Sequence, residues 1–114
     1  MRITALAITA ALAAVPAAAH HGWGSYDSEA AMTIEGPIET VTIGNPHGEM
    51  TVEHEGQSWL VILAPPSRMQ ARGASEDLLQ PGVTVRTYGY PRRDGTPEIR
   101  AEWIEVGDER IPLR

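Results

Sequence analysis

From residue 33 onward, the chain consists of short segments in which apolar and polar residues alternate, separated by glycine and proline. Alternation with a period of two is typical of β-strands that bury one face. The pattern predicts six strands, over residues 33–43, 49–55, 58–64, 83–90, 98–106 and 109–113. We therefore expect a mainly β fold.

The one stretch with helical signals follows the third predicted strand. Ser67 and Gln70 form a capping box and Gly73 supplies a stop, which predicts a helix over 67–72. Ser75 is expected to cap one further turn. Three strands, a short helix and two strands with an extension follow the order of a small OB-like, five-stranded, partly open barrel, with its helical connection between strands 3 and 4. A small β-sandwich is the rival fold, because periodicity does not separate the two.

The first predicted strand contains the pair Gly36-Pro37, and its apolar positions change phase between Ile38 and Val41. Glycine inside a strand pattern often marks a bulge or a close approach of another backbone. The sequence therefore predicts that this strand is bulged or bent.

Residues 1–19 have the layout of a cleavable export signal. Arg2 supplies the positive start, an uncharged apolar run follows, and Ala17 and Ala19 occupy the positions that a signal peptidase reads. The apolar run is interrupted by proline and is shorter than the ~20 residues that span a bilayer. We expect cleavage after Ala19, a periplasmic location without membrane insertion, and a single mature domain over 20–114.

Composition excludes several classes of protein. The chain has no cysteine, so it has neither a disulfide framework nor a lipid-attachment thiol. Removing Arg2 from nine basic residues leaves eight against fifteen acidic ones, a mature net charge of about −7. Because such a surface repels phosphate backbones, nucleic acid is not an expected partner.

Processing after Ala19 would place two histidines, His20 and His21, at the start of the mature chain. A histidine at a free N-terminus offers both its α-amine and its ring Nδ1 to one metal ion. A second imidazole completes a three-nitrogen set, the histidine brace, whose tetragonal geometry suits Cu(II); zinc is the next candidate. We choose His47 for that imidazole, because it lies in a turn of asparagine, proline and glycines that can hold the backbone while presenting the ring.

Several alternatives stay open. His21 is the fallback ligand, through the amine, the intervening amide and its own ring. His20 and His21 can equally be a disordered end, and His47 can simply cap a turn. His54 lies on the apolar face of a strand and is expected to pack there. The three methionines of the mature chain, Met32, Met50 and Met69, are expected to be packing residues rather than copper ligands.

Enzyme chemistry is not indicated. The serines lack the glycine-flanked elbow of a hydrolase, and there is no cysteine nucleophile or phosphate-binding glycine loop. An oxidative copper enzyme needs an open coordination position and a substrate surface, and the sequence indicates neither. The aromatic residues Trp23 and Tyr26 are expected to dock the N-terminal segment onto the barrel.

The mature start HHGWGSYD, the turn GNPHG and the segments LAPPSRMQARG, LLQPG and GYPRRDG resemble a family of small exported bacterial proteins of unknown function. Members begin HHS or HHG, followed by an aromatic-Asp pair, and carry an Asn-Pro-His turn after the first strand. The resemblance covers nearly all of the mature chain. It implies an exported barrel-like domain without an established activity, and it pairs the two histidine-bearing segments.

The leading hypothesis is a periplasmic copper-binding protein that handles or delivers copper to a partner protein, with His20, His21 and His47 as ligands. The rival is a metal-free OB-like module that binds a small ligand or a protein partner through its strand face or through the loop that contains Arg92 and Arg93.

Overall fold

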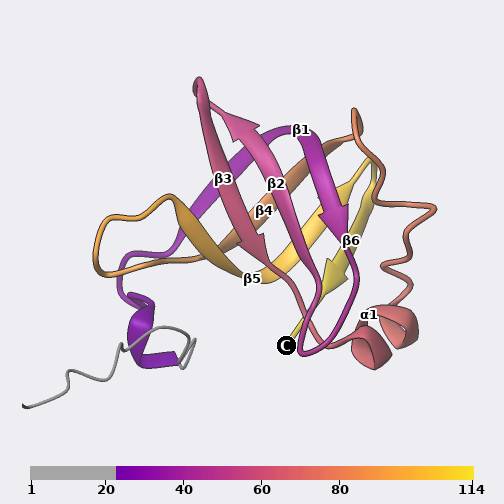
Figure 1. Cartoon of the computed structure of the whole chain (residues 1–114), viewed down its shortest axis with the longest axis horizontal. Helices are drawn as coiled ribbons and strands as arrows, with labels where there is room; N and C mark the ends of the chain where they lie inside the picture. Colours follow the sequence, from indigo (N-terminus) through magenta and orange to yellow (C-terminus); the bar gives the residue numbers. More distant parts are fainter. Residues whose placement is uncertain (1–22) are drawn as a thin grey trace, which may run out of the picture.

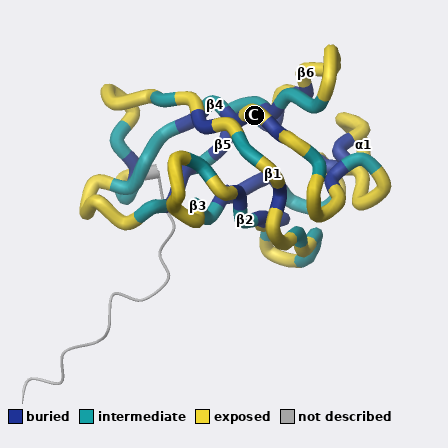
Figure 2. The backbone as a smooth tube through the Cα atoms, turned by 90° about the horizontal axis from the view of Figure 1, so that it is seen from above, coloured by how far each residue is buried: buried dark blue, intermediate teal, exposed yellow. Residues whose placement is uncertain are grey.

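The computed structural model of the protein describes residues 23–114. The expected export signal, His20 and His21 lie outside the described residues. Figure 1 shows the arrangement of the elements, and Figure 2 shows buried positions along the strands and mostly exposed positions in the turns between them. In chain order the elements are the 3-10 helix η1 (Trp23–Ser25), β1 (Met32–Thr42), β2 (Glu49–His54), β3 (Gln57–Ile62), α1 (Pro66–Arg72), β4 (Thr84–Pro91), β5 (Glu98–Val106) and β6 (Glu109–Pro112).

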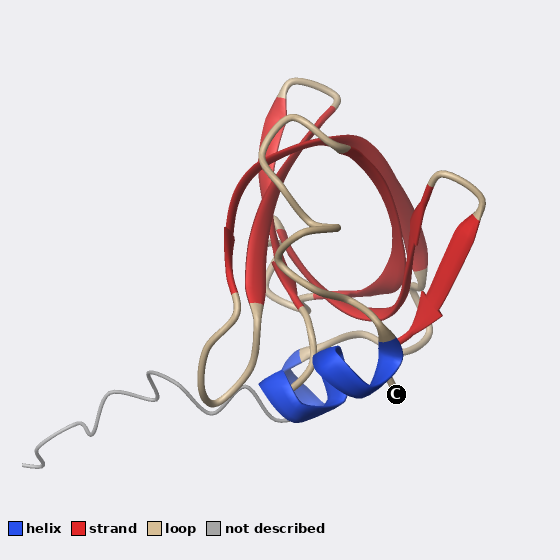
Figure 3. Cartoon of the chain, turned by 90° about the vertical axis from the view of Figure 1, so that its right-hand side faces the viewer, coloured by secondary structure: helices blue, strands red, loops and turns tan. Residues whose placement is uncertain are grey.

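The first five strands form a closed barrel in the order β3-β2-β1-β4-β5. All neighbours are antiparallel except the closing pair, in which residues 60–62 of β3 run parallel to residues 98–100 of β5. Figure 3 shows the strands as a ring with α1 beneath one end. One continuous sheet that closes on itself is a barrel, so the OB-like prediction is confirmed and the β-sandwich is excluded.

β1 pairs with two neighbouring strands, each over a different part of its length. Residues 32–37 pair with β4, residues 38–42 pair with β2, and the register shifts between Ile38 and Thr40. At the bend, a side-chain carbon on Gly36 would overlap the carbonyl oxygen of Glu53, so only glycine lets the two backbones approach. The predicted bend is confirmed.

Inward-facing aliphatic side chains fill the barrel, and the connection between β3 and β4 covers one end. Met50 and Met69 are each only 1% exposed, which confirms that they are packing residues. The buried cluster includes Ile34, Ile38, Met50, Val52, Val61, Leu63, Met69, Leu79, Val85, Ile99, Ile104, Ile111 and Leu113.

The predicted capping box is wrong. α1 begins one residue earlier, at Pro66, so Ser67 is already inside the first turn, and the residue before the helix, Pro65, makes no side-chain cap. Proline suits the first helical position, here Pro66, because its fixed φ fits the helix and it has no N–H to satisfy. The predicted stop is confirmed, because Gly73 has a φ of 81°. Among residues 23–114, no helix is long and apolar enough to span a membrane.

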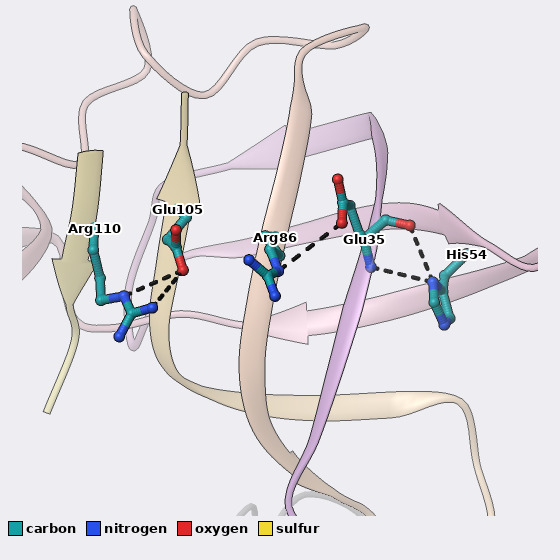
Figure 4. Close-up of polar contacts among 5 residues, drawn as sticks. All are labelled: Glu35, His54, Arg86, Glu105 and Arg110. Atoms are coloured by element: carbon teal, nitrogen blue, oxygen red, sulfur yellow. Dashed lines mark hydrogen bonds and ion pairs between the residues drawn. The ribbon is translucent and has the colours of Figure 1, made fainter. Parts of the chain in front are cut away.

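β6 lies outside the barrel and pairs with β5 alone. The guanidinium of Arg110 lies 3.9 Å from the ring centre of Trp103, and Tyr88 stacks with Trp103 at 5.4 Å. Arg110 also donates to Glu105 at 2.7 Å, as drawn in Figure 4. These contacts hold the extra strand against β4 and β5 through cation–π attraction and ring stacking.

Replacing Gly89 tests the closeness of β4 and β5. A side-chain carbon there would overlap the carbonyl oxygen of Arg100, so Gly89→Ala should lower the free energy of unfolding by roughly 1–3 kcal/mol. Gly44→Ala is the control, because nothing lies within 4 Å of the new carbon, and it should change stability by less than about 0.5 kcal/mol. Urea denaturation followed by tryptophan fluorescence measures both, and equal values would contradict the close approach.

Candidate functional site

Tyr26 anchors the N-terminal segment to the barrel. Its side chain is 1% exposed, and its hydroxyl donates a 2.6 Å hydrogen bond to Oε2 of Glu98, itself 5% exposed, at the start of β5. Tyr26 also forms a single antiparallel bridge with Arg92. The expected docking of the N-terminal segment through Tyr26 is confirmed.

Electrostatics keep the Tyr26 phenol neutral. Burial raises its pKa, and the hydrogen bond to the Glu98 carboxylate raises it further. Arg92 opposes this shift, and its Nη1 lies 3.5 Å from the same carboxylate oxygen. The phenol therefore remains a hydrogen-bond donor throughout the physiological pH range.

The loop between β4 and β5 also holds the N-terminal segment, through hydrogen bonds to the backbone of that segment. The N–H of Arg93 donates to Ser25 O at 3.0 Å, and its Nε donates to Gly24 O at 3.1 Å. The N–H of Asp27 donates to Pro91 O at 2.8 Å. Figure 1 shows η1 beside this loop. A partner that bound through Arg93 would compete with these internal contacts.

His47 lies in the loop that joins β1 to β2. The next residue, Gly48, ties this loop to the end of β3: its N–H donates to Ala64 O at 2.8 Å, and its carbonyl accepts from Leu63 N–H at 2.9 Å. The His47 Nδ1 lies 3.3 Å from Gly48 O and 3.7 Å from Oε1 of Glu49. The His47 side chain is only 18% exposed, so most of the ring is covered, while Gly48 holds the backbone of the loop.

A pocket of about 210 Å³ opens beside His47. Proline and aliphatic residues form one wall of the pocket, and the guanidinium groups of Arg100 and Arg114 give it positive charge. The lining residues are Pro46, His47, Ile62, Leu63, Pro65, Arg100 and Arg114.

Of the three predicted ligands, only His47 lies within the described chain. His20 and His21 fall outside it, so the three-nitrogen set stays a prediction. Within residues 23–114, no group of three or more histidine, aspartate or glutamate side chains is arranged to hold a metal ion. A site built on His47 would therefore need donors from elsewhere in the chain.

His54 has a structural contact. Its Nδ1 lies 3.1 Å from the backbone nitrogen and 3.0 Å from the carbonyl oxygen of Glu35, beside the bend in β1 (Figure 4). The ring thus bridges to backbone groups at a point where β1 pairs with β4 rather than β2. This agrees with the expectation that His54 packs on its strand.

Sequence reasoning missed three charged residues of this region: Glu98, Arg100 and Arg114. Alternation along the fifth predicted strand does place Glu98 and Arg100 on one face. Their neighbours, however, come from β3 and from the N-terminal segment, and strand periodicity carries no information about pairing between distant segments. Only the closing β3–β5 contact brings these groups together.

Comparisons with known proteins concern the family and the fold. A model described as a family of unknown function, DUF6152, matches residues 8–99. No curated protein matches the chain. Among solved structures, the crystal structure of a TiaS–tRNA–ATP complex is similar, with a TM-score of 0.52 and 18% identity over 67% of this chain. The match covers 18% of that protein's chain, and at this identity the likeness concerns the fold alone.

Tyr26→Phe tests the anchor. Removing the hydroxyl takes a donor from the buried Glu98 carboxylate and should lower the free energy of unfolding by about 1–3 kcal/mol. Because the folded-state pKa of Tyr26 is raised above about 10, the value of an unfolded tyrosine, this stabilisation is present below pH 10 and is lost as pH rises further.

Urea denaturation at pH 8 and at pH 10.5 measures both effects. The difference in stability between wild type and Tyr26→Phe should shrink at the higher pH. Tyr88→Phe is the control, because the Tyr88 ring stacks on Trp103 outside the barrel. Equal losses for the two variants at pH 8 would contradict the anchoring role of Tyr26.

Proposed function

We propose that this chain, which belongs to the DUF6152 family of unknown function, is a periplasmic copper-binding protein that handles or delivers the ion. Peptidase cleavage after Ala19 creates the site. His20 supplies the α-amine and ring Nδ1, His47 supplies a second imidazole, and His21 is an auxiliary ligand.

The donor set suits copper. Cu(II) favours a tetragonal arrangement of nitrogen ligands and stands at the top of the divalent affinity order. The α-amine must lose its proton to bind, and with an unperturbed pKa of about 8 it does so readily when copper competes at neutral pH. Metals lower in the order compete with that proton less well.

The observation that supports the proposal is the Tyr26 anchor. His20 precedes Tyr26 by six residues, and six extended residues span at most about 20 Å. Tyr26 is bonded to Glu98, two residues before Arg100 on β5, and Arg100 lines the same pocket as His47. A tether of this length is long enough for His20 to reach the surroundings of this pocket.

Fold-level reasoning points the same way. Ligands of OB-folds bind over strands 2 and 3, between the β1–β2 and β4–β5 loops. The N-terminal segment is docked on the β4–β5 loop, and His47 lies in the β1–β2 loop. His47 thus lies in one of the two loops that border the usual ligand face, and the segment that follows His20 in the chain docks on the other.

The surroundings of His47 favour transfer over storage. Metal-binding histidines commonly have one ring nitrogen oriented by a carbonyl or carboxylate, and Nδ1 of His47 lies near both Gly48 O and Glu49. Arg100 and Arg114 line the same pocket, and their positive charges weaken Cu(II) binding. A moderated affinity suits a protein that passes its ion on.

Blocking the amine tests the chelate. Exported protein whose intact mass corresponds to a start at His20 is titrated with Cu(II) and compared with the same protein after acetylation of its α-amine, which is selective because the chain has no lysine. Acetylation removes a ligand without creating a new copper motif, so affinity should fall at least about tenfold and the EPR spectrum should change. Identical affinity and spectra, or a natural start at another residue, would remove the case for copper.

Replacing the second imidazole tests the brace itself. His47→Ala should weaken Cu(II) binding about 10–100-fold and reduce the nitrogen hyperfine structure of the EPR spectrum. His54→Gln is the matched control, because His54 bonds to the Glu35 backbone on another part of the barrel, and it should leave both unchanged. If His47→Ala matches the control while the blocked amine abolishes binding, the ion is held locally through His21. If neither change matters, the metal-free OB-like module becomes the better hypothesis.

A further inference from the structure

Positive side chains gather at one end of an acidic chain. The protein has nine basic and fifteen acidic residues, a net charge of −6, yet Arg100 and Arg114 line one pocket together with His47. Arg114 is held there by an Nη2 hydrogen bond of 2.9 Å to Leu63 O. Arg68 lies nearby and donates from Nη1 to Leu113 O at 3.3 Å. Three arginines thus lie in or near this pocket.

The two arginines come from separate parts of the fold. Arg100 is on β5, in the short stretch that pairs with Ile62 to close the barrel. Arg114 follows β6 and reaches back to the end of β3. Their positions are therefore set by the barrel itself, which gives the pocket a pre-arranged pair of charges.

Burial and neighbouring charges both act on these arginines. The pKa of Arg114 is lowered to about 10, by burial first and then by the positive charge of Arg100, while Glu102 opposes the shift. Burial also lowers the pKa of Arg100; Tyr26 and Glu102 oppose that shift, and Arg68 adds to it. All remain charged at neutral pH. A bound anion would offset both the loss of hydration and the mutual repulsion.

The rest of the pocket is apolar. Ile62 and Leu63 are 3% and 1% exposed, and Pro46 and Pro65 complete the wall. None of the seven lining residues, all within the described part of the chain, is acidic. A guanidinium is a planar fork that matches a carboxylate, and an apolar wall suits a hydrocarbon tail.

We infer that this pocket binds the carboxylate of a small organic acid, with Arg100 and Arg114 facing the carboxylate and the proline–leucine–isoleucine wall holding a short hydrocarbon tail. Inorganic phosphate would use the charges but not the wall, so it should bind more weakly. The inference does not depend on copper, because the pocket and its charges belong to residues of the barrel.

Metal-free, ¹⁵N-labelled protein, dialysed free of chelator, is titrated with sodium butyrate at constant ionic strength, with butyramide and inorganic phosphate as comparisons. Butyrate should shift the amide signals of Gly48 and Leu63 and the Nε signal of Arg114 saturably. Butyramide lacks the charge and should bind about 10–100-fold more weakly. The protein with an acetylated α-amine should bind butyrate unchanged, which separates this inference from the copper proposal.

Variants locate the binding site. Arg100→Gln and Arg114→Gln should each weaken butyrate binding about tenfold or more. Arg86→Gln is the matched control, because it removes the same charge from an exposed position on β4 that pairs only loosely with Glu35, at 3.9 Å. Arg114→Gln preserves the test if Arg100→Gln does not fold, because Arg114 lies beyond the last strand.

Three results would overturn the inference. One is butyramide or phosphate binding as tightly as butyrate, and another is signal shifts that do not saturate. The third is an Arg86→Gln variant that weakens butyrate as much as Arg114→Gln does. Each would show that the pocket does not recognise a carboxylate with an apolar tail.

Discussion

The short parallel contact between β3 and β5 is the constraint on which the rest of the structure depends. Three residues, 60–62, pair with 98–100 and turn an open antiparallel sheet into a closed barrel. The same contact sets the start of β5, so it positions Glu98 to receive the Tyr26 hydroxyl and Arg100 to line the pocket beside His47. The pairing that closes the barrel thus also positions the residues around the His47 pocket.

A second consequence is that the N-terminal segment has a fixed point of attachment. Tyr26 and the Arg93 backbone contacts hold it against the β4–β5 loop, while the β1–β2 loop is tied to the end of β3 through Gly48. Both proposals draw on this end of the barrel. The copper proposal adds donors from residues 20 and 21, whereas the carboxylate proposal uses only groups that the barrel already holds.

Much of the fold could be predicted from the sequence, because its signals are local. Alternation identified the strands, Gly36-Pro37 indicated the bend in β1, and Gly73 marked the end of α1. The capping box failed because Pro66 begins the helix and leaves Ser67 inside it. Sequence pattern alone does not decide whether the helix begins at Pro66 or after Ser67. The end of β3 and the two prolines that follow it determine where the chain turns into the helix.

The sequence alone determined the mainly β character, the order of strands and helix along the chain that is typical of an OB-like barrel, and the acidic charge, and it placed His47 in the turn after the first strand. Only the tertiary structure decided that Glu98 bonds Tyr26 and that Arg100 and Arg114 share a pocket with His47. The physical reason is that periodicity reports which face of a strand is buried. Which distant strand lies beside it depends on how the sheet closes, and that is a property of the whole chain.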